Sequence, residues 1–266
     1  NTLYPSIAYL ARSLQGSGVQ VELRDLGLEL ARKLFSRSGL QELFQEIEKS
    51  SDETELPAPA WRAIALQKQH LQVIDPVMDF LQGKDPSLAR RILDTPFLPM
   101  GPRLERVDLG PFGGFSIEEA ARHLATVYLE DLADLVTATV EPGFALARYQ
   151  HHLSTGTSRF HPLQERLLQN SLLDQWIDSL SDSLQADVVG ISVPFPGTFD
   201  GALRIGQRLK QRGIPVLLGG GYVNTELREI KEPGIWNYVD AICYDDGEGP
   251  LQAWLDQMQG GEDRRH

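Results

Sequence analysis

Three stretches between residues 187 and 250 decide the fold: DVVGISVPFPG at 187–197, IPVLLGGGYVN at 214–224 and VDAICYDDGEGP at 239–250. Each contains an apolar run of strand length that ends in glycine, proline or small polar residues. An amphipathic segment at 198–213 separates the first two runs, and a shorter helical segment at 224–230 precedes the third. This alternation is typical of a parallel sheet with crossover helices. Ligands of such sheets bind outside the carboxyl ends of the strands, so we expect the functional residues in the three turns that follow them.

Composition narrows the class of protein. The chain has 266 residues, 41% of them hydrophobic, and a net charge of −12, which argues against a nonspecific nucleic-acid binder because phosphate contacts need clustered Lys and Arg. No apolar run is long enough to span a membrane. The single cysteine, Cys243, excludes an internal disulfide and an iron–sulfur cluster held by this chain alone. We expect a cytoplasmic protein that binds neither nucleic acid nor membrane.

The rest of the chain is predicted to be mostly helical. Helical patterns cover 25–48, 60–82, 87–94, 117–137 and 162–185, and irregular stretches rich in Pro, Gly or His fill 95–116 and 142–161. Residues 19–23 (VQVEL) follow a predicted helix at 6–15 and are predicted to form a strand. A strand should precede that helix, so we expect the chain to begin just after one. These patterns predict an α/β domain made of residues 1–25 and 186–260, with a helical insert at 26–185 packed on it.

The first two turns after strands restrict the backbone in opposite ways. Pro194 and Pro196 hold Val193 and Phe195 extended, which makes either a rigid connection or a stiff wall that presents the Ser192 hydroxyl and Phe195 to a flat ligand. In the second turn, Gly219, Gly220 and Gly221 cost backbone entropy, which favours a ligand lying against the main chain. The pattern matches neither a Walker loop nor Gly-x-Gly-x-x-Gly.

The third turn is acidic. Asp245, Asp246 and Glu248 either cap the next helix or accept hydrogen bonds from a ligand, and they would repel a phosphate. The remaining candidates are weak: His151, His152 and His161 are assigned to surface or packing roles, and Cys243 to an inert core position. We therefore expect no catalytic residue and no metal ligand in this chain.

The three strand-and-turn stretches resemble the N-terminal cobalamin-binding domain of cobalamin-dependent radical S-adenosylmethionine proteins. The opening NTLYPSIAYLARSLQGSGVQVELRDLGLELARKLFS is similar to the start of one bacterial branch of that family, just after its first strand. The resemblance implies a Rossmann-like sheet with the flavodoxin-type order 2-1-3-4-5, the helical insert lying between the second and third strands, and the corrin lying across the carboxyl ends of the strands. By resemblance, the cofactor-binding residues are Ser192, Val193, Pro194, Phe195, Pro196, Gly219, Gly220, Gly221, Tyr222, Asp246, Gly247 and Glu248.

The sequence departs from the family pattern in two places. None of its six histidines lies in an Asp-x-His-x-x-Gly motif, so a bound cobalamin would lack that cobalt ligand. The Cys-x-x-x-Cys-x-x-Cys motif is also absent, which assigns the 4Fe–4S cluster and S-adenosylmethionine to a C-terminal radical domain outside this sequence.

Our leading hypothesis is therefore a cobalamin-binding module that presents the corrin to that domain for methyl transfer or radical chemistry. One alternative is a degenerate module that serves as a docking or regulatory platform without cofactor. The other is a stand-alone α/β enzyme or nucleotide-binding protein.

Overall fold

The computed structural model describes residues 5–50, 56–94, 96–108, 116–144, 146, 167–228, 230 and 232–258. The chain forms two compact units: unit 1 comprises Asn1–Leu30 and Ala147–His266, and unit 2 comprises Ala31–Leu146. Helix α2 (Leu26–Leu34) begins in unit 1 and ends in unit 2. The protein is mixed α/β and mostly helical.

Unit 1 contains a three-stranded parallel sheet with the order β1-β2-β3. The strands are β1 (Val189–Ser192), β2 (Val216–Gly219) and β3 (Ala241–Ile242), so the three predicted strands and their parallel arrangement are confirmed. Val189 is in register with Val216, and Leu217 with Ala241. The third strand has only two residues, fewer than its apolar run of 239–243 predicts.

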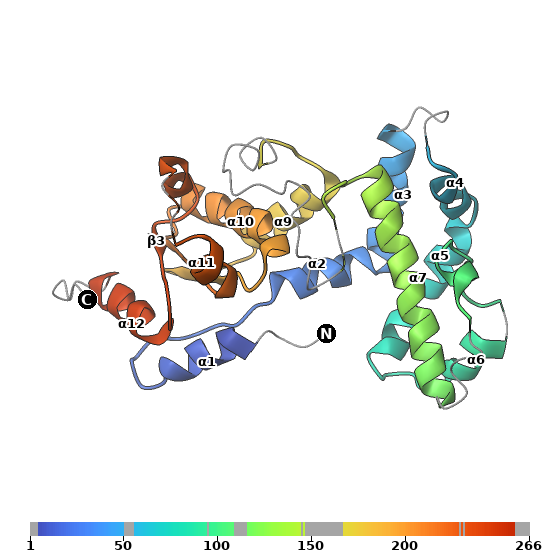
Figure 1. Cartoon of the computed structure of the whole chain (residues 1–266), viewed down its shortest axis with the longest axis horizontal. Helices are drawn as coiled ribbons and strands as arrows, with labels where there is room; N and C mark the ends of the chain where they lie inside the picture. The colour runs from blue at the N-terminus through green and yellow to red at the C-terminus, as the bar shows by residue number, and fades with distance from the viewer. Residues whose placement is uncertain are drawn as a thin grey trace. The chain divides into compact units, whose positions relative to one another are not determined.

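The side chains of this sheet alternate in direction, and apolar ones lie on both faces. Helices therefore pack on both faces. Val216 and Leu218 belong to a buried core that they share with Leu203 and Leu209 of α10 (Phe199–Gln211). Leu217 points the other way and lines a cavity with Trp254 of α12 (Glu248–Met258). Helix α9 (Leu172–Asp182) lies beside α10, as Figure 1 shows, and α11 (Gly221–Glu226) follows β2.

The predicted strand at 19–23 is wrong. After α1 (Pro5–Ser13) the chain turns through Gly16 and Gly18, whose φ angles are +88° and +78°, and residues 19–25 then belong to no helix or strand. Val21 and Leu23 are each 40% exposed. A strand is stable only where a neighbour bonds its backbone, and none of the strands in the described residues pairs with this segment. The alternating pattern VQVEL alone was therefore insufficient evidence for a strand.

The secondary structure of unit 2, within its described residues, is helical. Its helices are α3 (Arg37–Ser50), α4 (Ala58–Ala65), α5 (Gln67–Leu81), α6 (Leu88–Asp94), the 3-10 turn η2 (Leu104–Arg106) and α7 (Ile117–Thr139). Figure 1 shows α7 as the long helix beside which α4, α5 and α6 lie, while α3 packs against α5. The core of unit 2 includes the fully buried Phe44, Phe80 and Tyr128. The predicted capping box of Ser116 and Glu119 is confirmed at the start of α7.

Three of the predicted helices are interrupted. The helix predicted at 25–48 is divided because the Gly39 N–H donates to the Ser36 hydroxyl at 3.0 Å, which starts α3 as a new helix. The helix predicted at 60–82 is divided between α4 and α5. The helix predicted at 162–185 is interrupted within its described part: Leu167 is helical, residues 168–170 are not, and a capping box of Ser171 and Asp174 starts α9. The structure places α9 in unit 1 rather than in the helical unit.

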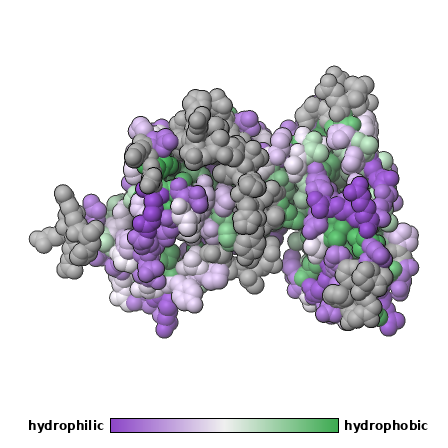
Figure 2. All heavy atoms as spheres, in the orientation of Figure 1, coloured by the Kyte–Doolittle hydropathy of each residue, from purple (hydrophilic) through white to green (hydrophobic). Residues whose placement is uncertain are grey.

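The helices of the described residues do not meet what a membrane span requires. Within the described ranges, no helix combines the length and the apolar character that crossing a membrane requires. Figure 2 shows that hydrophilic side chains occupy much of the coloured face, with hydrophobic ones gathered in small areas between them.

Candidate functional site

The turns after β1 and β2 are joined through their main chains. The Val193 N–H donates to the Gly219 carbonyl at 2.7 Å, and the Tyr222 N–H donates to the Val193 carbonyl at 3.1 Å. Both bonds extend the β1–β2 pairing beyond the strands. The first turn therefore lies directly on the glycine-rich second turn, at the carboxyl edge of the sheet.

This close contact explains one of the three glycines. Gly220 has a φ of +111°, and a Cβ added there would lie 2.6–2.8 Å from backbone atoms of Val193. Only glycine adopts this conformation readily, and only glycine leaves room for the neighbouring turn. A Cβ added to Gly221 would lie 3.3 Å from the Pro194 carbonyl oxygen, a tight contact but not a clash. A Cβ on Gly219 would make only ordinary contact with Cys243, at 3.5 Å. The sequence favoured a ligand against the main chain as the reason for three glycines, but contact with Val193 is sufficient to explain Gly220.

The third turn is bonded to the helix that follows the second. Asp245 has a positive φ of 62° and accepts a 3.1 Å hydrogen bond at its carbonyl from the Asn224 amide. Its N–H donates to the Asn224 side-chain oxygen at 2.5 Å, and its carboxylate pairs with Arg228. As a result, all three turns are connected through hydrogen bonds at one edge.

The predicted site residues divide into those that face the core and those that reach the surface. Val193 is fully buried in the core, whereas Tyr222 is half-buried, with its ring packed against Phe199 at a centroid distance of 5.4 Å. Burial, followed by the charge of Glu226, raises the pKa of the Tyr222 hydroxyl.

The remaining predicted residues reach the surface to different degrees. Partly buried ones are Ser192, Pro194, Phe195, Pro196, Gly219, Gly220 and Gly247; exposed ones are Gly221, Asp246 and Glu248.

Helix α1 occupies part of this edge. The Ser6 and Ser192 hydroxyls lie 3.1 Å apart, and a Cβ on Gly247 would be 3.0 Å from a methyl group of Leu10. The sequence did not predict this arrangement, because the two contacts join residues far apart in the chain. The chain itself thus covers the edge near Ser192 and Gly247.

A cavity of about 210 Å³ adjoins the third turn. Its wall is formed by β2, β3 and α12 and includes Leu217, Cys243, Pro250 and Trp254. Burial and the nearby Glu248 raise the pKa of the Cys243 thiol, which keeps it protonated. Cys243 is therefore poorly suited to act as a nucleophile, in agreement with its predicted inert role.

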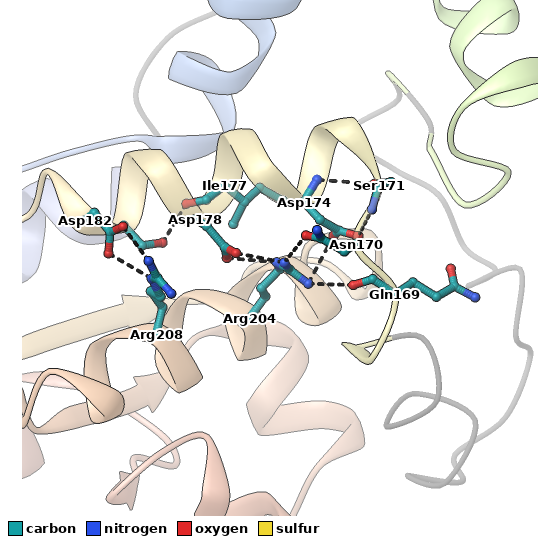
Figure 3. Close-up of polar contacts among 10 residues, drawn as sticks. Gln169, Asn170, Ser171, Asp174, Ile177, Asp178, Asp182, Arg204 and Arg208 are labelled. Carbon is teal, nitrogen blue, oxygen red and sulfur yellow. Dashed lines mark hydrogen bonds and ion pairs between the residues drawn. The ribbon is translucent and has the colours of Figure 1, made fainter. Parts of the chain in front are cut away.

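A buried charge cluster between α9 and α10 was missed by the sequence analysis. The Arg204 guanidinium, on a residue only 9% exposed, donates to both Asp178 carboxylate oxygens at 2.9 and 2.8 Å and lies 3.7 Å from the Asp174 carboxylate (Figure 3). It also donates to the Gln169 carbonyl and the Asn170 side chain. Its donors are directed at groups of the chain itself, so we assign this cluster to joining the two helices.

The comparisons with known proteins identify no relative. No family model, no characterised protein and no solved structure matches this chain. Within the described part of the chain, no group of three or more His, Cys, Asp or Glu side chains is placed to hold a metal ion. His151, His152 and His161 lie outside the described residues.

Proposed function

We propose that unit 1 is the cobalamin-binding module of a radical S-adenosylmethionine enzyme, and that the corrin lies on the carboxyl edge of its sheet. The main supporting observation is that the three strand-end turns are joined into one surface. Val193 and Gly220 join the first two turns, and hydrogen bonds between Asn224 and Asp245 join the third. A surface fixed in advance in this way loses little freedom when a broad ligand settles on it.

Several residues of this edge suit such a ligand. Gly219 and Gly221 leave main chain accessible to a flat molecule, and the exposed Asp246 and Glu248 offer acceptors for amide donors. We further propose contacts from Ser192, Pro194, Phe195, Pro196 and Gly247. The cavity beside Cys243 provides space into which part of a large ligand could extend.

Cobalamin would supply the methyl-transfer or radical chemistry, while the 4Fe–4S cluster and S-adenosylmethionine would belong to a C-terminal partner domain. The role of this chain would be to bind and orient the corrin. Its exposed carboxylates at the edge disfavour a nucleotide phosphate there.

We also propose the flavodoxin-type order for the complete sheet, with the helical segment inserted between the second and third strands. Two features support it. Strands β1, β2 and β3 are adjacent in chain order, as the last three strands of that order would be. In addition, α10 covers one face of the sheet and α12 covers the other. Ser192, which contacts Ser6 of α1, points to the face that α12 covers.

A spectroscopic titration with hydroxocobalamin or methylcobalamin tests the binding proposal. At micromolar protein we expect a change in the corrin absorption and retention of corrin through gel filtration. Gly221→Phe should reduce retention about tenfold or more by placing bulk on the edge, which corresponds to at least about 1.4 kcal/mol. Gln211→Phe, at the exposed end of α10, is the matched control and should retain corrin as the wild type does. The proposal is refuted if corrin is retained neither by the folded wild type nor by Leu10→Ala, which shortens the α1 side chain at the edge.

The contacts of α1 favour a second candidate, a platform that keeps the fold without a cofactor. Ser6 and Leu10 already lie against the edge residues Ser192 and Gly247. If this is the role of unit 1, neither the wild type nor Leu10→Ala should take up corrin. Uptake by Leu10→Ala but not by the wild type would instead show that α1 blocks a binding site.

A further inference from the structure

Unit 2 contains a cavity of its own, with a volume of about 190 Å³. Its wall is mostly apolar and includes Pro57, Ala63, Met100, Pro102, Leu132 and Leu135. For comparison, an engineered apolar cavity of about 150 Å³ takes up benzene. The cavity in unit 2 is therefore large enough for one six-membered ring with a small substituent.

One buried polar side chain lies in this apolar wall. His70 is only 5% exposed and lines the cavity, and its Nδ1 lies 3.1 Å from the Tyr128 hydroxyl oxygen. The rings of Phe44 and Tyr128 flank the imidazole at centroid distances of 5.9 and 5.7 Å, and neither lines the cavity. The other ring nitrogen, Nε2, has no hydrogen-bond partner among the described residues. A buried polar atom without a partner destabilises the protein unless a ligand or water satisfies it.

The hydrogen bond to Tyr128 determines which nitrogen carries the proton. The Tyr128 hydroxyl is fully buried, and Nδ1 is its one hydrogen-bond partner within the described ranges. The phenol hydrogen therefore needs Nδ1 as its acceptor, which leaves the proton of the neutral imidazole on Nε2. Burial also keeps His70 neutral, because it lowers the pKa of the imidazole to about 4. His70, which lines the cavity, thus carries its N–H donor on the ring nitrogen that Tyr128 does not use.

The charged groups around the cavity already have partners. Arg62 pairs with Glu105, and Asp134 with Arg103. The Asp131 carboxylate accepts hydrogen bonds from the backbone N–H groups of Arg103 and Leu104 at 2.8 and 3.1 Å. These ion pairs and hydrogen bonds leave little reason for a charged ligand to enter, so a neutral ligand is favoured.

We propose that this cavity binds a small, neutral, apolar molecule with one hydrogen-bond acceptor, which receives the Nε2–H of His70. The site lies within unit 2 and is independent of cobalamin binding by unit 1.

Two probes of nearly equal shape test the proposal on the full chain: acetophenone, which has a carbonyl acceptor, and α-methylstyrene, which has a methylene group in its place. Calorimetric titration should detect both in the wild type. The His70→Phe/Tyr128→Phe pair keeps both rings but removes both polar groups. It should lower the ratio of acetophenone to α-methylstyrene affinity by about fivefold or more, because the carbonyl would then be buried without a donor.

Two further measurements keep the proposal falsifiable if the double variant fails to fold. Ala63→Leu, at a half-buried cavity position, should weaken both probes about tenfold or more by filling space. In the wild type, ¹⁵N spectra should show the His70 proton on Nε2 and a shift of that signal when acetophenone is added. Failure of both probes to bind at millimolar concentration would overturn the proposed site. A proton on Nδ1, or an affinity ratio unchanged in the double variant, would overturn the proposed donor.

Discussion

Gly220 is the residue on which the shape of the candidate edge most depends. Its positive φ and the 2.6 Å distance from its added Cβ to the Val193 carbonyl oxygen mean that any side chain would force two turns apart. We expect Gly220→Ala to destabilise the protein by about 2–4 kcal/mol, measured by urea unfolding.

Gly201 in α10 provides the matched control for Gly220. A Cβ there meets nothing within 4 Å, so Gly201→Ala should be stabilising by up to about 1 kcal/mol because alanine favours helix. Equal effects of the two substitutions would contradict the role assigned to Gly220.

His70 should make the stability of the protein depend on pH. Its folded-state pKa of about 4 lies below the ordinary value of 6.5, because burial disfavours the imidazolium. The unfolded chain therefore binds a proton between these pH values that the folded chain does not bind. The free energy of unfolding is therefore not reduced by His70 above about pH 6.5. As the pH falls toward 4, it decreases by roughly 3 kcal/mol in all.

Urea unfolding of the wild type and of His70→Phe/Tyr128→Phe between pH 4 and 7 measures this dependence. The double variant should lose less stability than the wild type as the pH falls through that range. Parallel curves for the two proteins would show that His70 titrates normally.

At the scale of elements, α9 and α10 are joined by complementary charged stripes. Asp174, Asp178 and Asp182 follow one another at intervals of four on α9. Arg204 and Arg208 of α10 and Arg212, directly after it, have the same spacing. Arg208 pairs with Asp182, and Arg212 donates to the Ser181 and Leu184 carbonyls. The contacts advance in the same direction along both helices, so α9 and α10 run parallel.

Removing Arg204 should be far more costly than removing Arg208. Arg204→Met would leave the Asp174 carboxylate, on a residue only 1% exposed, buried without its arginine, and we expect a loss of about 3–5 kcal/mol. The side chains of Arg208 and Asp182 are 40% and 44% exposed, and water screens their attraction, so Arg208→Met should cost much less stability. Denaturant unfolding compares the two variants. If Arg208→Met were as destabilising as Arg204→Met, burial would not be the cause.

These elements also show what the sequence could predict. The three strands were predictable because each is an apolar run that ends abruptly, and the capping box at Ser116 is a local pattern. The strand at 19–23 was wrong because pairing depends on a partner that a local pattern does not reveal. The charged stripes were visible as intervals of four, but their burial depends on how α9 packs. The role of Gly220 could not be predicted, since it follows from contact with Val193 in another turn.

For the whole molecule, the division into two units has a consequence for folding. Unit 1 is built from two separate ranges of the chain, whereas unit 2 is one continuous range, Ala31–Leu146. Unit 2 also has its own core, in which Phe44, Phe80, Tyr128 and Leu132 are almost completely buried. A continuous range with its own core satisfies the usual requirements of an independent domain.

We therefore expect a fragment of residues 26–146, which keeps all of α2, to fold alone. It should unfold in urea in a single cooperative transition with an m value of about 1–3 kcal/mol/M, and circular dichroism and tyrosine fluorescence should report the same midpoint. It should also keep the pH dependence assigned to His70, since Phe44 and Tyr128 lie within the fragment. A gradual, noncooperative loss of helix would show that the core of unit 2 is insufficient without the rest of the chain.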